Sequence, residues 1–82
     1  MTKKVGEITH FFSNISVAVI QISDTLEVGD KIRIKGSTTD FEQEVDSMQI
    51  EHENIEKAEK GQDIGMKVKD NVRPGDEVFV VD

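Results

Sequence analysis

The stretch Val28-Gly29-Asp30-Lys31-Ile32-Arg33-Ile34-Lys35 places a glycine turn directly before five residues that alternate between charged and apolar side chains. Successive side chains of an extended strand point to opposite faces, so the two isoleucines would face a core and the three basic residues would face water. The stretch therefore predicts a half-buried strand over residues 31–35.

Runs of valine and isoleucine recur along the whole chain, separated by turn residues at intervals of roughly eight to twelve positions, which is typical of a β-sandwich or barrel. A second Gly-Asp turn, Gly75-Asp76, precedes a similar apolar run near the end. We expect six strands, at residues 4–12, 15–23, 31–35, 41–50, 64–69 and 77–81. The predicted fold is a single all-β domain over residues 1–82, a closed six-stranded antiparallel β-barrel, since closure leaves no unpaired edge strand.

The charged segment 51–63 is the one place where a helix is expected. Ile55 and Ala58 lie three positions apart, a spacing that suits one or two helical turns docked on the barrel. Gly61 would then end the helix.

The composition limits the classes of function. The chain has 82 residues, no cysteine and a formal net charge of −7. Disulfides and thiolate metal sites are therefore excluded, and the acidic balance opposes binding to nucleic acid and favours a basic protein partner. No apolar run follows Lys3 and Lys4, so we expect no signal peptide, no membrane span and a cytoplasmic protein.

No group of residues points to catalysis or to a metal. His52 lies between Glu51 and Glu53, but neighbouring side chains of an extended chain point in opposite directions, whereas a metal needs converging ligands. No serine lies at a spacing from His10 or His52 that is typical of a nucleophile and its base, and the chain has no cysteine. We expect no catalytic residue, no metal, no cofactor and no enzymatic activity.

The basic row at positions 31, 33 and 35 has two interpretations. It could be a nucleic-acid stripe. Alternatively, a hairpin between residues 31–35 and 41–50 would neutralise it, through the pairs Lys35–Glu42, Arg33–Glu44 and Lys31–Asp46.

Three stretches, in order and with ordinary spacing, carry a family resemblance. They are Leu26-Glu27-Val28-Gly29-Asp30-Lys31-Ile32, Val45-Asp46-Ser47-Met48-Gln49 and Arg73-Pro74-Gly75-Asp76-Glu77-Val78. Together they resemble domain two of the elongation factor Tu family of translational GTPases. Thr9-His10-Phe11-Phe12 adds a similarity to stand-alone small proteins called translation elongation factor-like. A similar barrel also occurs as a C-terminal appendage of collagenase-like peptidase homologues.

The resemblance implies a barrel of the translation-factor domain-two type, acting as a non-catalytic interaction module that is linked to translation or RNA. Its partners would be tRNA or ribosome-associated factors. The family's ligand groove corresponds here to Phe11, Phe12, Ser13, Asn14, Met48, Gln49 and His52. The alternative implied function is that of a protein-binding accessory partner of an enzyme such as a collagenase-like peptidase homologue.

The phosphate-binding loop of the GTPases, G-x-x-x-x-G-K-[ST], does not occur in the sequence. Its backbone cradle and lysine are what hold the nucleotide phosphates. We therefore expect no guanine nucleotide to bind.

Phe11 and Phe12 are adjacent, so on a strand they face opposite sides and only one can enter the barrel without a bulge. The other either covers the outside of the barrel under residues 51–63 or is exposed as an anchor for a partner. The sequence leaves open which of the two rings belongs to the core.

Overall fold

The computed structural model describes residues 2–81. This part of the chain contains ten β-strands and no helix. In chain order they are β1 (Thr2–Phe12), β2 (Val17–Ile22), β3 (Leu26–Glu27), β4 (Lys31–Lys35), β5 (Asp40–Glu44), β6 (Met48–Ile50), β7 (Glu53–Ile55), β8 (Lys57–Ala58), β9 (Asp63–Lys67) and β10 (Glu77–Val81). The all-β prediction is confirmed. Within residues 2–81 there is accordingly no helix that could cross a membrane.

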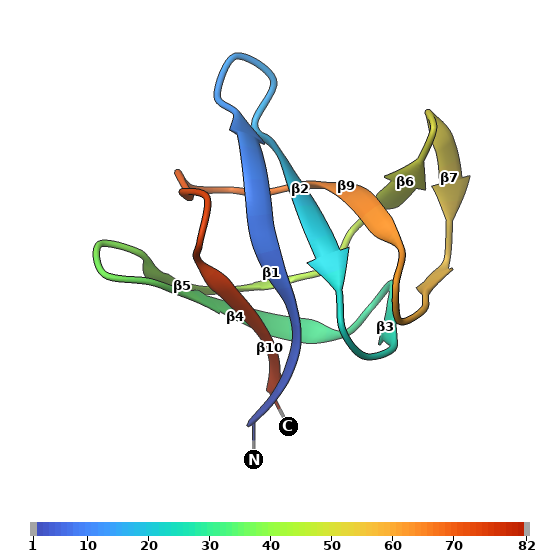
Figure 1. Ribbon diagram of the computed structural model, residues 1–82, viewed down its shortest axis with the longest axis horizontal. Coiled ribbons are helices and arrows are strands. Elements are labelled where there is room, and N and C mark those ends of the chain that lie inside the picture. Colours follow the sequence, from blue (N-terminus) through green and yellow to red (C-terminus); the bar gives the residue numbers. More distant parts are fainter. Residues whose placement is uncertain (1, 82) are drawn as a thin grey trace.

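Eight strands form one antiparallel sheet in the order β5-β4-β10-β1-β2-β9-β6-β7, and β3 pairs with β8 in a separate ladder. The sheet curls around a common core, and Thr2 pairs with Val81, so β1 begins beside the end of β10 (Figure 1). Within residues 2–81 the two outer strands, β5 and β7, do not pair with each other. The predicted closed barrel of six strands is therefore not confirmed.

The Gln43 side chain makes two hydrogen bonds on the side of β5 that has no strand neighbour within residues 2–81. Its Nε2 donates to the carbonyl of Lys67 at 3.0 Å, and its Oε1 accepts from the N–H of Lys69 at 2.9 Å. Gln43 is nearly buried, so both bonds satisfy backbone groups that have little access to water. This amide joins β5 to the chain that leaves β9, where an open hollow of about 370 Å³ remains between them.

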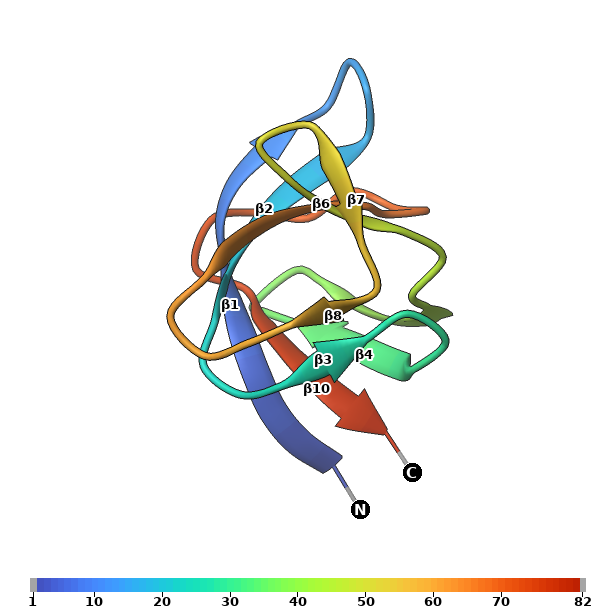
Figure 2. The ribbon, with the colours of Figure 1, turned by 90° about the vertical axis from the view of Figure 1, so that its right-hand side faces the viewer.

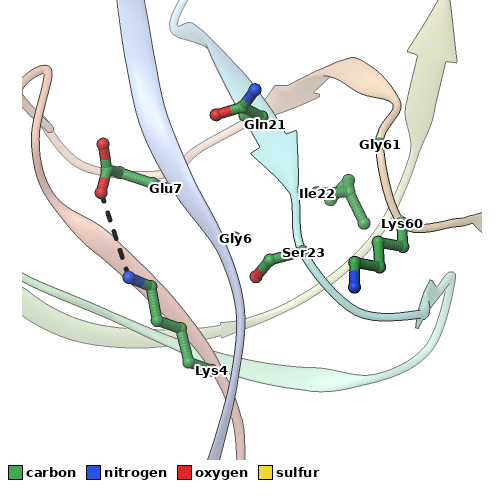
Figure 3. Close-up of a pocket in the computed structure, with 8 residues that line it drawn as sticks. All are labelled: Lys4, Gly6, Glu7, Gln21, Ile22, Ser23, Lys60 and Gly61. Carbon is green, nitrogen blue, oxygen red and sulfur yellow. Dashed lines mark ion pairs between the residues drawn. The ribbon is translucent and has the colours of Figure 1, made fainter.

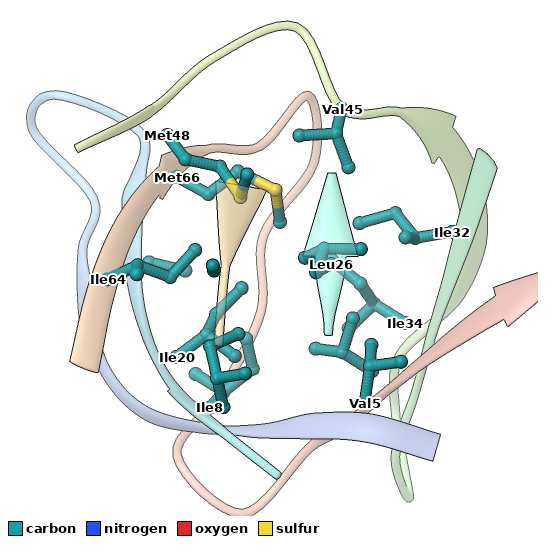
Figure 4. Packing of buried hydrophobic residues seen from close by; sticks show 14 of the residues in the cluster. Val5, Ile8, Ile20, Leu26, Ile32, Ile34, Val45, Met48, Ile64 and Met66 are labelled. Carbon is teal, nitrogen blue, oxygen red and sulfur yellow. The ribbon is translucent and has the colours of Figure 1, made fainter. Parts of the chain in front are cut away.

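The inward side chains of the curled sheet form one apolar core (Figure 4). Ile32 and Ile34 of β4 are fully buried, as the alternation predicted, and so are Ile64 and Met66 of β9. Burying each such side chain contributes about 1.5–3 kcal/mol. The remaining large members are Val5, Ile8, Ile20, Ile22, Leu26, Val45, Met48 and Val78.

Three glycine turns share one geometry, at residues 27–30, 59–62 and 73–76. Gly29, Gly61 and Gly75 have φ values of 96°, 93° and 96°, which L side chains rarely adopt. In each turn the N–H of the fourth residue donates to the carbonyl of the first at 3.1 Å. A side-chain oxygen of that fourth residue (Asp30, Gln62 or Asp76) accepts from the N–H of the first at 2.8 to 2.9 Å. The two Gly-Asp turns seen in the sequence thus have a third counterpart with glutamine.

The prediction of a helix within residues 51–63 is wrong. The chain forms β7, which pairs with β6, and then β8, which pairs with β3. Ile55 lies opposite Met48, and Ala58 is buried opposite Leu26, so both apolar residues reach the core from strands. A helix of one or two turns is marginal alone, and long-range strand pairing outcompetes it here. The expected strand 41–50 is likewise divided into β5 and β6.

The predicted register of the β4–β5 hairpin is also wrong. The N–H of Gly36 donates to the carbonyl of Thr39 at 2.7 Å, so the turn is shorter than expected and β5 begins at Asp40. Lys31, Arg33 and Lys35 consequently lie opposite Glu44, Glu42 and Asp40. The ion pairs run diagonally: Arg33 Nε and Nη2 donate to the carboxylate of Asp40 at 2.7 and 2.9 Å, and Lys31 Nζ lies 3.3 Å from Glu42. Two members of the basic row are therefore neutralised by neighbours.

This register can be tested with a double-mutant cycle on Arg33 and Asp40. The guanidinium donates to the carboxylate and holds the pKa of Asp40 below its usual range. Because the carboxyl pKa is lower in the folded state than in the unfolded state, the pair stabilises the protein at pH values above the unfolded-state pKa. This stabilisation is lost as the pH falls through the folded-state pKa. We expect Arg33→Gln and Asp40→Asn to be coupled in urea melts at neutral pH, with the coupling fading in acid. A cycle on Arg33 and Glu44 should show none, and the reverse result would contradict the register.

Candidate functional site

One surface of the sheet carries no acidic side chain and no lysine or arginine. It consists of outward side chains of β1, β2, β9 and β6, bounded on one side by the row of Glu7 and Asp63 and on the other by Lys67, which lies opposite Val17. Across the strands His10 lies opposite Val19, Val19 opposite Gly65, and Gly65 opposite Gln49, while Phe12 lies opposite Val17. We call this surface the hairpin face; its members are His10, Phe12, Val17, Val19, Gly65, Gln49 and the β1–β2 turn, residues 13–16.

The most exposed large apolar side chains of residues 2–81 lie on the hairpin face. Phe12 is 48% exposed and Ile15 is 56% exposed, and the N–H of Ile15 donates to the carbonyl of Phe12 at 3.2 Å across the turn. The ring of His10 stacks with that of Phe12 at a centroid distance of 6.4 Å and an interplanar angle of 21°. Two exposed apolar side chains thus come from one turn at the end of the hairpin.

The hairpin itself lacks formal charge. Residues 8–23 contain no Asp, Glu, Lys or Arg, although 33% of all residues in the chain are of these types. Ion pairs among residues 2–81 involve the first half of β1, Asp24 and strands β4, β5 and β10. There Glu77 accepts from Lys4 at 2.8 Å and raises its pKa, and Lys3 donates to Asp24 at 2.9 Å and lowers the pKa of that carboxyl. Charge is therefore gathered on other parts of the molecule.

A β-bulge decides which phenylalanine belongs to the core. The β1–β2 register shifts between Ile8 and His10, so the alternation changes phase after the buried Ile8. Phe11 then lies opposite the buried Ala18 and packs against the core, and Phe12 points outward. Without the bulge, strict alternation from Ile8 would bury Phe12.

The structure distributes the predicted site residues over both sides of the sheet. Ser13 and Asn14 lie exposed in the β1–β2 turn, and Gln49 points outward from β6, where its Nε2 donates to Asn54 Oδ1 at 3.0 Å. Met48 is fully buried in the core and offers no surface to a ligand. Phe12, Ser13, Asn14 and Gln49 are therefore the predicted residues that share the hairpin face.

His52 lies apart from these residues, in the two-residue turn between β6 and β7. Glu51 and His52 have φ values of 50° and 67°, the left-handed conformation that hairpin turns of type I′ require. Asn-Gly is the usual sequence there, and non-glycine residues in this region of φ are strained. The strained turn directly follows β6, the strand that contributes Gln49 to the hairpin face.

Relieving this strain should stabilise the protein. We expect the double change Glu51→Asn with His52→Gly to raise the free energy of unfolding by about 1 kcal/mol, because Asn-Gly adopts a type I′ turn readily. Urea unfolding measures the effect. A loss of stability would show that the two native side chains make contacts that outweigh the strain.

A second hollow, of about 260 Å³, is lined by Gly6 and Gly61 together with the charged residues Lys4, Glu7 and Lys60 (Figure 3). Lys4 is already paired with Glu77 at 2.8 Å and lies 4.0 Å from Glu7. The ammonium group of Lys4 is thus occupied by carboxylates of β10 and β1. Within residues 2–81 no group of three or more His, Asp or Glu side chains is placed to hold a metal ion.

Sequence reasoning missed His10, Ile15, Val17, Val19 and Gly65 as members of the hairpin face. The family resemblance points to the ends of two expected strands and not to the residues between them. The uncharged run 8–23 was the available signal, because a run of that length is unusual in so charged a chain. It would have pointed to the whole hairpin.

Comparison with known proteins corrects the predicted family. The chain is 40% identical over 79 residues to an uncharacterized protease, MJ0090, of Methanocaldococcus jannaschii, and 41% identical over 80 residues to a collagenase of Porphyromonas gingivalis. Each match covers 95% of this chain but only 19% and 22% of the respective relative. The chain thus spans about a fifth of the length of the curated relatives it matches. No protein-family model matches the chain.

Solved structures agree on the fold. Two crystal structures of the C-terminal domain of a Geobacillus thermoleovorans protein assigned to the U32 peptidases superpose with TM-scores of 0.88 and 0.90. They cover 93% and 95% of this chain at 19% and 18% identity. The predicted kinship with translation factors is therefore wrong, and the RNA, tRNA and ribosome association that it implied has no support in these relatives. The alternative, an association with a collagenase-like peptidase, fits them better.

Proposed function

We propose that the chain is a non-catalytic interaction module that binds the catalytic part of a collagenase-like peptidase. One observation carries the proposal: 95% of this chain matches a segment that makes up only 19% to 22% of proteins named protease and collagenase. In those proteins the module occurs together with roughly four times its own length of other chain. A segment that recurs beside such a chain is expected to contact it.

The surface chemistry supports binding rather than catalysis. The hairpin face presents apolar side chains together with amide and hydroxyl groups, and a histidine whose neighbour is an aromatic ring. A general base needs the proton of a nucleophile or a water within hydrogen-bond reach and a group that orients it. An exposed aromatic beside an aliphatic side chain suits a binding anchor.

The test is co-purification of the tagged protein from its native source. We expect one stoichiometric protein similar to the remainder of the peptidase relatives. As a matched control, the same preparation from cells that carry an unrelated tagged β-domain should lack that protein. Recovery of tRNA or ribosomal particles in its place would overturn the proposal.

Guanine nucleotide should not bind. The sequence lacks the G-x-x-x-x-G-K-[ST] loop, whose backbone N–H groups and lysine hold the phosphates in the GTPases. Calorimetry with GTP should show no heat of binding, and GTP hydrolysis should stay at background. Micromolar affinity for GTP would contradict this prediction.

A further inference from the structure

We propose that the β1–β2 hairpin is the surface by which this module docks on its peptidase partner, with Phe12 and Ile15 entering an apolar, uncharged pocket of that protein. The inference rests on the proposed function and adds to it the docking residues and the chemistry of the site that receives them.

The composition of the hairpin matches that of an interface core. Such cores are depleted of charged residues and enriched in aromatic ones. Residues 8–23 are free of formal charge, and two of the three large hydrophobic side chains exposed in residues 2–81 stand at its turn. Single exposed hydrophobic residues are common, whereas two from one turn of an uncharged hairpin favour an interaction site.

The hairpin holds these groups in place before binding. Six cross-strand pairs join β1 to β2, and Thr9 Oγ1 donates to the carbonyl of Val19 at 3.3 Å beside the bulge. The His10 ring stacks on that of Phe12 and limits its freedom. An anchor that is already ordered loses less conformational entropy when it binds.

Shape and charge favour a protein pocket over a second copy of this chain. The β1–β2 turn projects from the end of the molecule away from the two termini, so it needs a concave receptor (Figures 1 and 2). Three hollows on residues 2–81 are bordered by charged side chains: Lys4, Glu7 and Lys60 in one, Glu44, Asp46 and Lys67 in another, and Arg33 and Lys35 in the third. These hollows do not suit a phenyl ring, and a net charge of −7 on each copy opposes self-association.

The position of the termini agrees with the same partner. Thr2 pairs with Val81 at the opposite end from the β1–β2 turn, so a chain joined at either terminus leaves the hairpin free (Figure 1). The module can therefore contact the catalytic part through the hairpin whether the two are joined or separate.

The experiment uses a double variant that carries both Phe12→Ser and Ile15→Ser. The single variant Val28→Ser is its matched control. Val28 is the third exposed large hydrophobic residue, 39% exposed in the turn between β3 and β4. The peptidase chain recovered with the tagged wild-type protein is repurified and titrated with each variant by calorimetry. We expect the double change to weaken binding at least about 30-fold and the control to change it less than about 2-fold, with both variants folded by circular dichroism.

The outcomes separate the two proposals. If no peptidase chain is recovered with the wild-type protein, the proposed function fails, and this inference fails with it. If the chain is recovered and the double variant binds it as well as wild type, only the docking surface is overturned. Sedimentation that shows a wild-type dimer lost in the double variant would assign the hairpin to a second copy. Flotation with phosphatidylcholine vesicles, lost in the same variant, would assign it to a membrane surface, and either result overturns the protein pocket.

Discussion

Replacing Phe11 by alanine is expected to destabilise the protein by about 2–3 kcal/mol, whereas the same change at Phe12 should cost less than about 1 kcal/mol. Phe11 packs against the core opposite Ala18 and is only partly exposed, so its loss leaves a cavity that the sheet cannot fill. Truncating a fully buried phenylalanine costs roughly 3–5 kcal/mol, and we expect a smaller loss here because the Phe11 side chain is only partly buried. Phe12 is 48% exposed and loses mainly its contact with His10.

Thermal unfolding followed by circular dichroism distinguishes the two variants. For a domain of this size a loss of 1 kcal/mol lowers Tm by roughly 4–8 °C, so Phe11→Ala should lower it by roughly 10–20 °C. Phe12→Ala should melt close to wild type. Equal losses in both variants would mean that both rings are structural, and the hairpin face would then lose its aromatic anchor.

Replacing Gly6 by alanine is expected to destabilise the protein by about 1–3 kcal/mol through overpacking. A Cβ at this position would lie 2.6 Å from Cγ2 of Ile20 and 2.9 Å from the carbonyl oxygen of Gln21. The second contact is with backbone that is held in the sheet and cannot move away cheaply. Gly6 also adjoins the register shift between β1 and β10, so any adjustment disturbs two strand pairings at once.

Gly65 provides the matched control for Gly6. Both glycines lie on strands that pair with β2, Gly6 on β1 and Gly65 on β9, but Gly65 faces outward. There a Cβ would meet Val17 Cγ1 at 3.5 Å and the carbonyl of Gln49 at 4.0 Å, which are ordinary contacts. Gly65→Ala should leave the stability within about 0.5 kcal/mol or raise it by up to about 1 kcal/mol, since alanine restricts the unfolded chain. Urea midpoints measure both variants. If Gly6→Ala were as stable as Gly65→Ala, the packing described around β1 would be wrong.

The candidate site shows where sequence reasoning succeeds and where it ends. The sequence predicts that one of the rings of Phe11 and Phe12 faces inward and the other outward, because adjacent residues on a strand point to opposite sides. Which ring faces inward depends on a bulge after Ile8, and nothing local to Thr9 announces it. The family resemblance implies a groove with both Met48 and Gln49, but strand alternation lets only one of two adjacent side chains face the same surface. The relation to peptidases, by contrast, came from whole-chain similarity and from no single residue.

The sequence by itself determined the features that depend on neighbouring residues. The alternation at residues 31–35 and 77–81 placed β4 and β10 with their observed bounds, and the glycines before Asp30 and Asp76 specified turns with positive φ. Only the tertiary structure decided the β4–β5 register, the split of residues 41–50, the strands in place of a helix over 51–63, the bridge from Gln43 to β9 and the exposure of Phe12. The physical reason is that each of these depends on partners far apart in the chain. Short segments have several conformations of similar free energy, and long-range pairing and burial select among them.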